Sequence, residues 1–422
     1  MKRALIALVA GLALLAAWIW SVNFRGEDDI HDAPPPGPVA ASVAQRGAYL
    51  ARAGNCMLCH TERGGADYAG GRPIDTPFGT LYASNITPDP ATGIGGWSVD
   101  HFWRALHHGR SRDGRLLYPA FPYTNYTQVT RADADALFGY LRTLKPVQRA
   151  NTQHRLRWPY STQAALAVWR ALYFRPGIHA DDAKHSADWN RGAYLVQGLG
   201  HCSACHTSRN ALGASRDLLD LSGGMIPMQN WYAPSLASPA EAGVAGWEVE
   251  HITRLLQTGV APGGTVLGPM AEVVLHSTQH LAPADLRAMA VYLKALPPPE
   301  GEPPAVAAAA TNTDITERGA RLYADHCLQC HGAQGQGVPG AYPPLAGSRA
   351  VVLSTTSNLV QVVLAGGYPP ATAGNPRPFG MPPYATVFSD AEVAAVLTYI
   401  RASWGNRAAP VSELSVAQQR GG

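Results

Sequence analysis

All six cysteines of this 422-residue chain lie in three copies of one pentapeptide, and no other feature limits the possible folds as strongly. Each copy has two cysteines separated by two residues, and a histidine follows the second cysteine directly. The copies are Cys56–His60, Cys202–His206 and Cys327–His331. A chain built around three such copies is expected to repeat the local structure around each of them.

The pentapeptide predicts covalent attachment of haem. Two cysteines at positions i and i+3 face one side of a helical turn and reach two vinyl groups of a porphyrin, while the adjacent histidine faces the iron. A zinc site would need a second pair of ligands, which the repeats do not offer. A thioredoxin-like motif would need a βαβ setting, which is missing. Structural disulfides would not require a histidine after every second cysteine. We therefore expect three covalently bound haem c groups. The predicted tethers are Cys56, Cys59, Cys202, Cys205, Cys327 and Cys330, and the predicted proximal iron ligands are His60, His206 and His331.

Two methionines are predicted as sixth iron ligands in the second and third repeats. Met270 and Met381 occupy equivalent loops, each just before the closing helix of its repeat. A thioether opposite a histidine raises the reduction potential of the iron. Met225 and Met228 lie too early in the second repeat to serve. In the third repeat we also expect the Pro344 carbonyl to accept a hydrogen bond from the motif histidine.

The first repeat departs from this pattern. Phe121 stands where the methionine would be, and phenylalanine does not bind iron. His107 is the candidate sixth ligand, with His108 as its alternative, and bis-histidine ligation would lower the potential relative to Met/His. Two other interpretations stay open: both histidines lie at the surface or contact propionates, or the iron is open or bound by a tyrosine.

Each repeat is predicted to be mainly helical. An Arg-Gly-Ala helix start precedes each motif, a Gly- and Pro-rich loop follows it, and a closing helix has apolar residues three and four apart. A further helix is expected over Ser161–Phe174, and no strand alternation is long enough to build a sheet. The predicted fold is mainly α, with three tandem cytochrome c-like haem domains at 46–147, 189–296 and 315–408. The other segments are a signal or anchor helix over 1–24, a spacer over 25–45, a bridge over 148–188, a Pro/Ala-rich linker over 297–314 and a flexible tail over 409–422.

The N-terminus predicts export from the cytoplasm. Lys2 and Arg3 precede an apolar run that ends near Phe24 and is long enough to cross a bilayer. Trp18 and Trp20 fit an interfacial belt at the outer end, and no small-x-small cleavage site follows them. A retained anchor and a cleaved signal both place the remaining chain outside the cytoplasm, on the periplasmic side of the membrane.

Composition and motifs exclude several classes of function. The net charge is +3 and the basic residues are scattered, so nothing indicates nucleic-acid binding. A gas or redox sensor would need an output domain, and the sequence indicates none. A peroxidase-like haem enzyme, using an open iron in the first repeat, is the alternative to an electron carrier, although the sequence shows no distal Arg–His pair.

Several long segments resemble one known family. They include "PFGTLYASNITPDPATGIGGWSVDHFWRALHHG", "GPMAEVVLHSTQHLAPADLRAMAVYLKALP" and "MPPYATVFSDAEVAAVLTYIRASWGN". These segments are similar to triheme cytochrome c subunits of membrane-bound periplasmic dehydrogenases. The resemblance implies an electron carrier that is not itself an enzyme. It would take electrons from a catalytic subunit of the pyrroloquinoline quinone, flavin or molybdopterin type and pass them to ubiquinone or a terminal oxidase. The departure at Phe121 inclines the interpretation toward a molybdenum-type partner.

Overall fold

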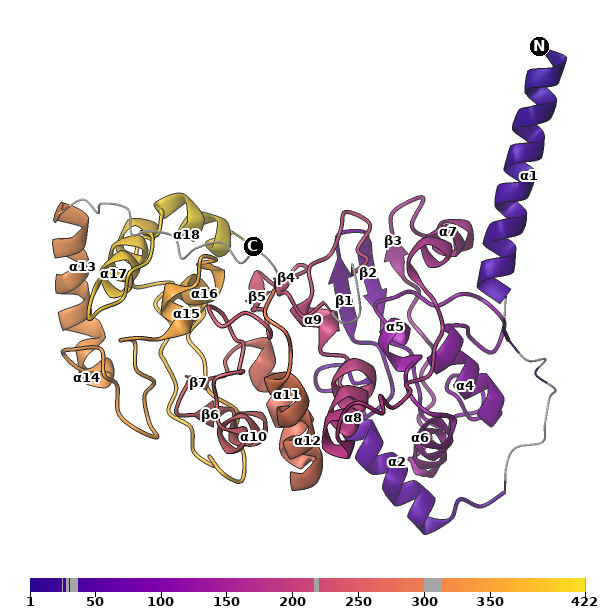
Figure 1. Cartoon of the computed structure of the whole chain (residues 1–422), viewed down its shortest axis with the longest axis horizontal. Helices are drawn as coiled ribbons and strands as arrows, with labels where there is room; N and C mark the ends of the chain where they lie inside the picture. Colours follow the sequence, from indigo (N-terminus) through magenta and orange to yellow (C-terminus); the bar gives the residue numbers. More distant parts are fainter. Residues whose placement is uncertain (25, 28–29, 31–36, 216–219, 300–312, 422) are drawn as a thin grey trace. The chain divides into compact units, whose positions relative to one another are not determined.

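The computed structural model describes residues 1–24, 26–27, 30, 37–215, 220–299 and 313–421 (Figure 1). These residues are mainly helical and form two compact units. The described parts of residues 1–181, 196–204 and 209–218 make up the first unit, and those of 182–195, 205–208 and 219–422 make up the second. Residues 31–36 of the predicted spacer (25–45) and residues 300–312 of the predicted linker (297–314) lie outside the described residues.

The first unit consists of helices and one small antiparallel sheet. Its helices are α1 (Lys2–Phe24), α2 (Ala41–Ala53), α3 (Cys56–His60), α4 (Val99–His108), α5 (Tyr123–Tyr126), α6 (Arg131–Thr143) and α7 (Gln163–Tyr173). Its strands, in sheet order, are β1 (Pro73–Thr76), β2 (Gly79–Tyr82) and β3 (Arg155–Leu156).

The second unit contains most of the remaining helices and two short hairpins. Its helices are α8 (Ala187–Ala193), α10 (Val249–Thr258), α11 (Pro269–His276), α12 (Pro283–Lys294), α13 (Thr313–His326), α14 (Leu328–His331), α15 (Arg349–Val352), α16 (Ser357–Ala365), α17 (Asp390–Ala402) and α18 (Glu413–Arg420), with a 3-10 turn at Thr278–His280. The hairpins pair β4 (Gly224–Ile226) with β5 (Trp231–Ala233) and β6 (Val260–Ala261) with β7 (Gly264–Thr265). A π-helical turn (Tyr194–Leu199) and α9 (Ser203–His206) have residues in both units.

The expectation that the chain builds no sheet is wrong for the first unit. There β2 pairs with both β1 and β3, and Gly79 lies opposite Leu156. No strand among the described residues is longer than four residues. Strands this short give no alternating pattern that a sequence can reveal, and β3 pairs with a segment distant in sequence.

One helix crossing occurs three times, and it explains the repeated Arg-Gly-Ala segments. The glycine of each segment lies against a backbone carbonyl of the closing helix. A Cβ atom on Gly47, Gly192 or Gly319 would lie 2.0, 2.1 or 2.2 Å from a carbonyl oxygen. The carbonyls belong to Ala136 of α6, Ala288 of α12 and Ala395 of α17. Only glycine therefore permits this approach of the two helices.

The arginine of each segment closes the same crossing with an ion pair. Its partner is always the third residue of the closing helix, where a carboxylate also favours the positive end of the helix dipole. The bonds are Arg46 Nε to Asp133 Oδ1 (2.8 Å), Arg191 Nε to Asp285 Oδ1 (2.8 Å) and Arg318 Nη2 to Glu392 Oε1 (3.0 Å). The pairs are partly exposed, so we expect each to contribute about 1 kcal/mol or less. Most of the stability of the crossing then comes from close packing.

The substitution Gly192→Ala tests this crossing. Alanine gains about 1 kcal/mol in helix propensity, but its methyl group would meet the Ala288 carbonyl and force the helices apart. Overpacking costs about 1–3 kcal/mol. Because the methyl group would meet backbone, we expect a cost at the upper end and a net loss of about 2 kcal/mol in the free energy of unfolding. Denaturant unfolding measures this loss. The control is Gly246→Ala, because a Cβ there meets no atom within 4 Å; equal effects of the two substitutions would refute the crossing.

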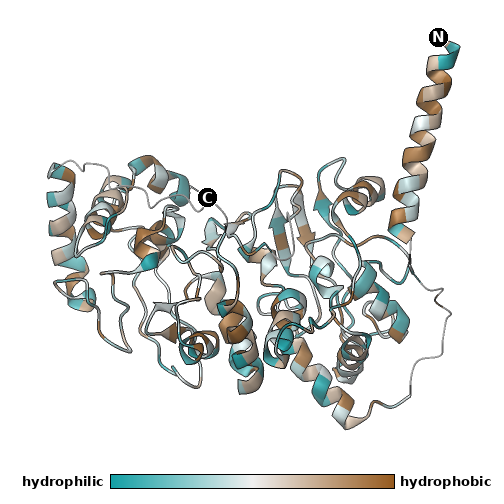
Figure 2. Cartoon of the chain, in the orientation of Figure 1, coloured by the Kyte–Doolittle hydropathy of each residue, from teal (hydrophilic) through white to brown (hydrophobic). Residues whose placement is uncertain are grey.

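The predicted helix over Ser161–Phe174 is confirmed as α7, and it packs against the end of α1. Thr162 caps α7 by accepting a hydrogen bond from the Ala165 amide. Asn23 near the end of α1 donates to the Ala167 carbonyl at 2.9 Å and accepts from Arg170 Nε at 2.9 Å. The helix α1 is long and apolar enough to cross a membrane, and Figure 2 shows mostly apolar residues along its length.

Candidate haem-binding sites

Each cysteine motif lies on a short helical turn. The first motif is α3 itself, the second includes α9 and the third includes α14, and the motif histidine is the last residue of each helix. None of the six cysteines forms a disulfide. In the second and third motifs the first cysteine directly precedes the helix, and the second cysteine and the histidine lie on it.

The three motif histidines make the same hydrogen bond. In each, Nδ1 lies within hydrogen-bond distance of a backbone carbonyl on the loop that follows the motif. The pairs are His60 with Ser84 (2.7 Å), His206 with Pro234 (2.7 Å) and His331 with Pro343 (3.1 Å). A neutral imidazole that donates from Nδ1 has Nε2 available for a metal, and the bond fixes the orientation of the ring.

The hydrogen bond of His331 corrects one detail of the sequence analysis. Pro343 provides the carbonyl, and not Pro344 as expected. Gly337 packs against the same segment, where a Cβ on Gly337 would lie 2.8 Å from the Pro343 carbonyl oxygen.

Burial keeps the motif side chains neutral. It lowers the pKa of His60, His206 and His331, although the bond to the carbonyl opposes this shift. Neutral imidazole is the form that binds a metal ion. Burial also raises the pKa of Cys56 to about 12 and that of Cys327 to about 11, so these thiols are protonated at neutral pH before any attachment.

Phe121 lies close to the first motif. Its ring centre is 5.4 Å from that of Tyr126, whose hydroxyl donates to the Gly54 carbonyl at 3.0 Å, two residues before Cys56. The loop that would carry a sixth ligand in this repeat thus reaches the motif, with phenylalanine in place of methionine. Cys56 also packs against an aromatic and aliphatic core cluster that includes Phe138.

His107 and His108 are buried in a different environment. His107 stacks on Trp103 with ring centres 4.5 Å apart, and its Nδ1 lies 2.9 Å from the Thr127 carbonyl. Burial, His107 and nearby arginines, of which Arg170 has the largest effect, lower the pKa of His108 to about 4. These contacts favour a packing role for both histidines. Iron ligation by His107 through Nε2 stays a prediction.

Met270 and Met381 both lie close to segments that hold a motif. Met381 pairs with Gly367 through two backbone hydrogen bonds and packs against the core cluster that Cys327 also contacts. Met270 is in the first turn of α11. Gly268, which precedes that turn, lies against Trp231 of β5. Pro234, the residue after β5, provides the carbonyl within hydrogen-bond distance of His206 Nδ1.

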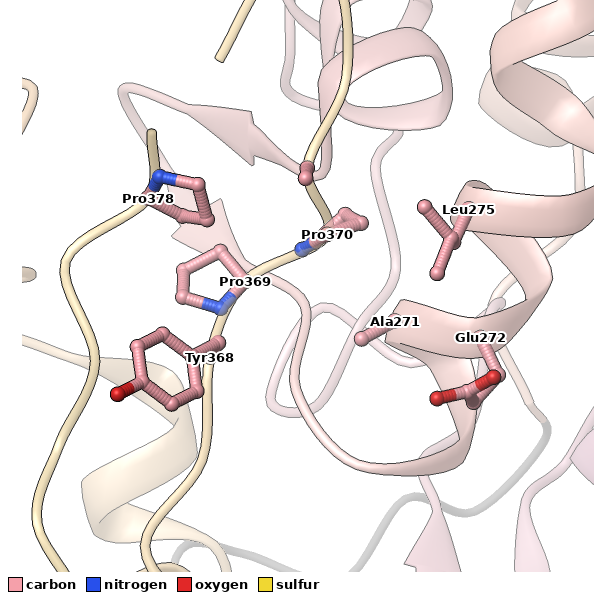
Figure 3. Close-up of a pocket in the computed structure, with 8 residues that line it drawn as sticks. Ala271, Glu272, Leu275, Tyr368, Pro369, Pro370 and Pro378 are labelled. Carbon is pink, nitrogen blue, oxygen red and sulfur yellow. The ribbon is translucent and has the colours of Figure 1, made fainter. Parts of the chain in front are cut away.

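The segments that carry these two methionines meet at one open cleft. Figure 3 shows Ala271 and Leu275 of α11 on one side and a proline-rich loop on the other. The loop contributes Tyr368, Pro369, Pro370 and Pro378, and it ends at Met381. The predicted sixth ligands of the second and third haems therefore belong to neighbouring segments of one unit.

Sequence reasoning missed two kinds of residue at these sites. The carbonyls of Ser84 and Pro234 give no signal, because any residue has a carbonyl. Tyr126 was also missed. The acidic partners of the repeated arginines were detectable, since all three closing helices have Asp or Glu at their third position.

The residues present fit covalently bound haem. Paired thiols on a helical turn next to an oriented neutral imidazole are the donor set that a c-type haem requires. Among the described residues, no three His, Cys, Asp or Glu side chains cluster to hold another metal ion. Fold and site together define a c-type cytochrome. The sequence matches the cytochrome c family over residues 44–145 and 316–404.

Curated relatives identify the family further. The chain is 39% identical over 388 residues to the cytochrome c subunit of a quinone-type alcohol dehydrogenase from Gluconacetobacter polyoxogenes, covering 87% of this chain and 82% of the relative. It is 36% identical over 437 residues to the gluconate 2-dehydrogenase cytochrome c subunit of Pantoea cypripedii, covering all of this chain and 95% of the relative. A nicotinate dehydrogenase subunit of Pseudomonas putida is 40% identical over 93% of this chain, which spans only 32% of that relative.

The chain belongs to the family of cytochrome c subunits of dehydrogenases. These relatives are electron-transfer subunits and not catalytic subunits. The protein is accordingly a haem-binding electron-transport protein.

Proposed function

We propose that this chain carries three covalently bound haem c groups and passes electrons from the catalytic subunit of a dehydrogenase to ubiquinone or a terminal oxidase. The observation that carries the proposal is the triple recurrence of one arrangement: a CxxCH turn, a histidine bonded to a carbonyl, and a glycine crossing. The same recurrence supports three tandem haem domains within the two compact units.

Bound haem supplies an iron that accepts and releases one electron, and the chain's residues determine how it does so. The cysteine pairs would hold the porphyrin edge, and the motif histidines would bind the iron through Nε2. Met270 and Met381 would supply thioether ligands to the second and third haems. With these ligands supplied by the chain, the second and third domains would exchange electrons without chemistry on a substrate. The relatives do not favour the alternative of a peroxidase-like enzyme.

The catalytic partner is inferred from the relatives and from Phe121. Relatives of this chain belong to alcohol, gluconate and nicotinate dehydrogenases. Phe121 inclines the proposal toward a molybdopterin partner of the nicotinate or aldehyde type, with pyrroloquinoline quinone and flavin partners as the alternatives. Purification with the native partner, followed by identification of its cofactor, decides among the three.

We further propose that α1 is retained and holds the protein at the periplasmic side of the cytoplasmic membrane. The contacts of Asn23 with α7 support retention. In addition, Arg110 lies 4.4 Å from the centre of the Phe24 ring. Cleavage after residue 24 would remove Asn23 and leave the buried Arg170 without this partner, which is costly for a charged group.

Intact mass spectrometry of the protein from its own host tests the proposal. We expect the mass of the full chain plus three haems. Fewer than three covalent haems would contradict the triheme function. A mass lacking the first two dozen residues would contradict the retained anchor alone, because a cleaved signal also places the rest of the chain outside the cytoplasm.

The variant His107→Ala tests the sixth ligand of the first haem. If His107 only packs against Trp103, we expect a loss of stability of about 2 kcal/mol and an unchanged absorption spectrum. Ligation by His107 would instead give a high-spin spectrum for the first haem. A change in spin state in His107→Ala would establish His107 as the ligand. The same change in His108→Ala alone would instead assign the ligand to His108, the alternative candidate on the same turn.

A further inference from the structure

Helix α7, in the first unit, leaves an apolar face exposed. Val168 and Leu172 lie four residues apart, so they share one side of the helix, and both are exposed, as is Tyr173. The one charged residue of this helix, Arg170, is buried on the opposite side. Helices at a water-facing surface normally present polar and charged side chains to the solvent. The exposed face of α7 is therefore typical of a surface that contacts something other than water.

Exposed aromatic and apolar residues also flank this helix in the sequence. Trp158 is 82% exposed, and Tyr160 and Ile178 are exposed as well. Tryptophan and tyrosine are enriched where a protein meets the interface between membrane and water, because their rings are apolar and each has a polar end. The residue types around α7 thus match those found at a membrane interface.

The charged side chains of the same stretch also favour a lipid surface. Residues 145–180 contain no Asp or Glu. In contrast, the basic residues Arg155, Arg157 and Arg175 lie before and after the helix, and all three are exposed. Basic side chains next to an apolar face favour a bilayer surface that contains anionic headgroups.

The contact with α1 places α7 where α1 would leave the bilayer. The 23 residues of α1 make it about 35 Å long, and about 20 residues cross the hydrocarbon core. Counted from Ala4, where the apolar run begins, such a span ends at Asn23. Asn23 is the residue that bonds to Ala167 and Arg170 of α7, and Figure 1 shows α7 beside the end of α1. The helix α7 therefore lies at the level of the lipid headgroups.

We propose that the exposed face of α7 is a second membrane contact, which inserts into the headgroup layer beside α1 and holds the first unit against the periplasmic surface of the bilayer. The partner is a lipid surface that contains anionic headgroups. The inference rests on the proposed retention of α1. A unit held in this way presents one side to the membrane, in which the proposed acceptor ubiquinone is dissolved.

The test attaches a nitroxide spin label to the full-length protein with its haems bound. Leu172→Cys gives the labelling site on α7. The control is Val43→Cys on α2, which Figure 1 shows apart from α7. Val43 and Leu172 are apolar residues of the same unit with similar exposure, 40% and 51%. The protein is reconstituted in vesicles of phosphatidylcholine and phosphatidylglycerol. Power saturation then compares access of the label to oxygen, which concentrates in lipid, with access to a nickel chelate, which stays in water.

We expect the ratio of oxygen access to nickel access to be several-fold higher at residue 172 than at residue 43. The label in Val168→Cys, on the same face of α7, should respond like the label at residue 172. Because these side chains are exposed, the substitutions should leave the fold intact. A label at residue 168 or 172 that responds like the one at residue 43 would overturn the inference.

A protein partner would give a different result. If the face of α7 contacts the catalytic subunit, the label at residue 172 stays open to the nickel chelate in vesicles. It then loses access to both reagents only when the native catalytic subunit is added. This outcome would overturn the inference and assign the face to that subunit.

Intact mass separates failure of this inference from failure of the proposed function. A full-length protein with three haems and a water-exposed label at residue 172 refutes the membrane contact alone. A mature protein without α1 refutes the retained anchor and this inference with it. Fewer than three haems refute the triheme function, whereas the contact with lipid is judged by the labels.

Discussion

The double variant Cys327→Ser, Cys330→Ser is expected to carry two covalent haems in place of three. Serine cannot form the thioether bonds, so the third haem is lost while the first and second motifs remain intact. About a third of the covalent haem absorbance should disappear, and intact mass should fall by one haem. Because each motif has its own histidine and carbonyl, we expect the corresponding pairs Cys56/Cys59 and Cys202/Cys205 to behave in the same way.

The control for this experiment is Leu328→Ser, which changes the same turn. The Leu328 side chain is 40% exposed and is not a tether, so the variant should retain three haems. Three haems in the double-serine variant would show that the third motif does not attach one. Loss of all haems would show instead that the three sites do not mature independently.

The variant Met381→Ala is expected to lower the reduction potential of the third haem. Removal of the thioether leaves the iron with a weaker sixth ligand such as water, and axial ligands set haem potentials over a range of about 0.8 V. We expect the reduction potential of the third haem to fall by an amount on the order of 0.1–0.3 V. The contribution of this haem to the Met-to-iron charge-transfer absorption should also be lost. The backbone bonds between Met381 and Gly367 do not need the side chain, so the loop should keep its conformation.

Two further methionine variants sharpen the result. Met270→Ala should produce the same fall at the second haem, whereas Met225→Ala, at a side chain that is 46% exposed on β4, should change no potential. If Met225→Ala lowered the potential of the second haem and Met270→Ala left it unchanged, Met225 would be the sixth ligand of that haem. In the unmodified protein, titration should show three one-electron steps with the first haem lowest. A first haem with the highest potential would speak against bis-histidine ligation.

The helices were predictable because their signals are local. The closing helices α6, α12 and α17 show apolar residues at spacings of three and four, and Thr162 caps α7 as its sequence indicates. The π-helical turn at Tyr194–Leu199 was not predictable, because its altered hydrogen bonding depends on packing and not on residue type. The same reason explains the small sheet, in which β3 pairs with a distant segment.

The motif residues could be identified from sequence because cysteine and histidine chemistry needs those residue types at fixed spacing. What surrounds them depends on the fold. The carbonyl expected to accept from His331 was misplaced by one residue, since carbonyl direction follows loop conformation. The contacts of Tyr126 gave no signal in the sequence, because Gly54 and His201, which it meets, lie far apart in the chain.

The glycine crossing lies apart from the loop that we propose to influence the reduction potential. Gly47 and its ion-paired neighbour Arg46 contact α6, whereas Phe121 lies on a loop outside that crossing. We therefore expect an exchange at Phe121 to change the proposed redox centre of its own repeat and to leave the crossing of α2 and α6 in place. Because the same crossing recurs at Gly192 and Gly319, the ligand loop of each repeat could be varied while its helix crossing is kept.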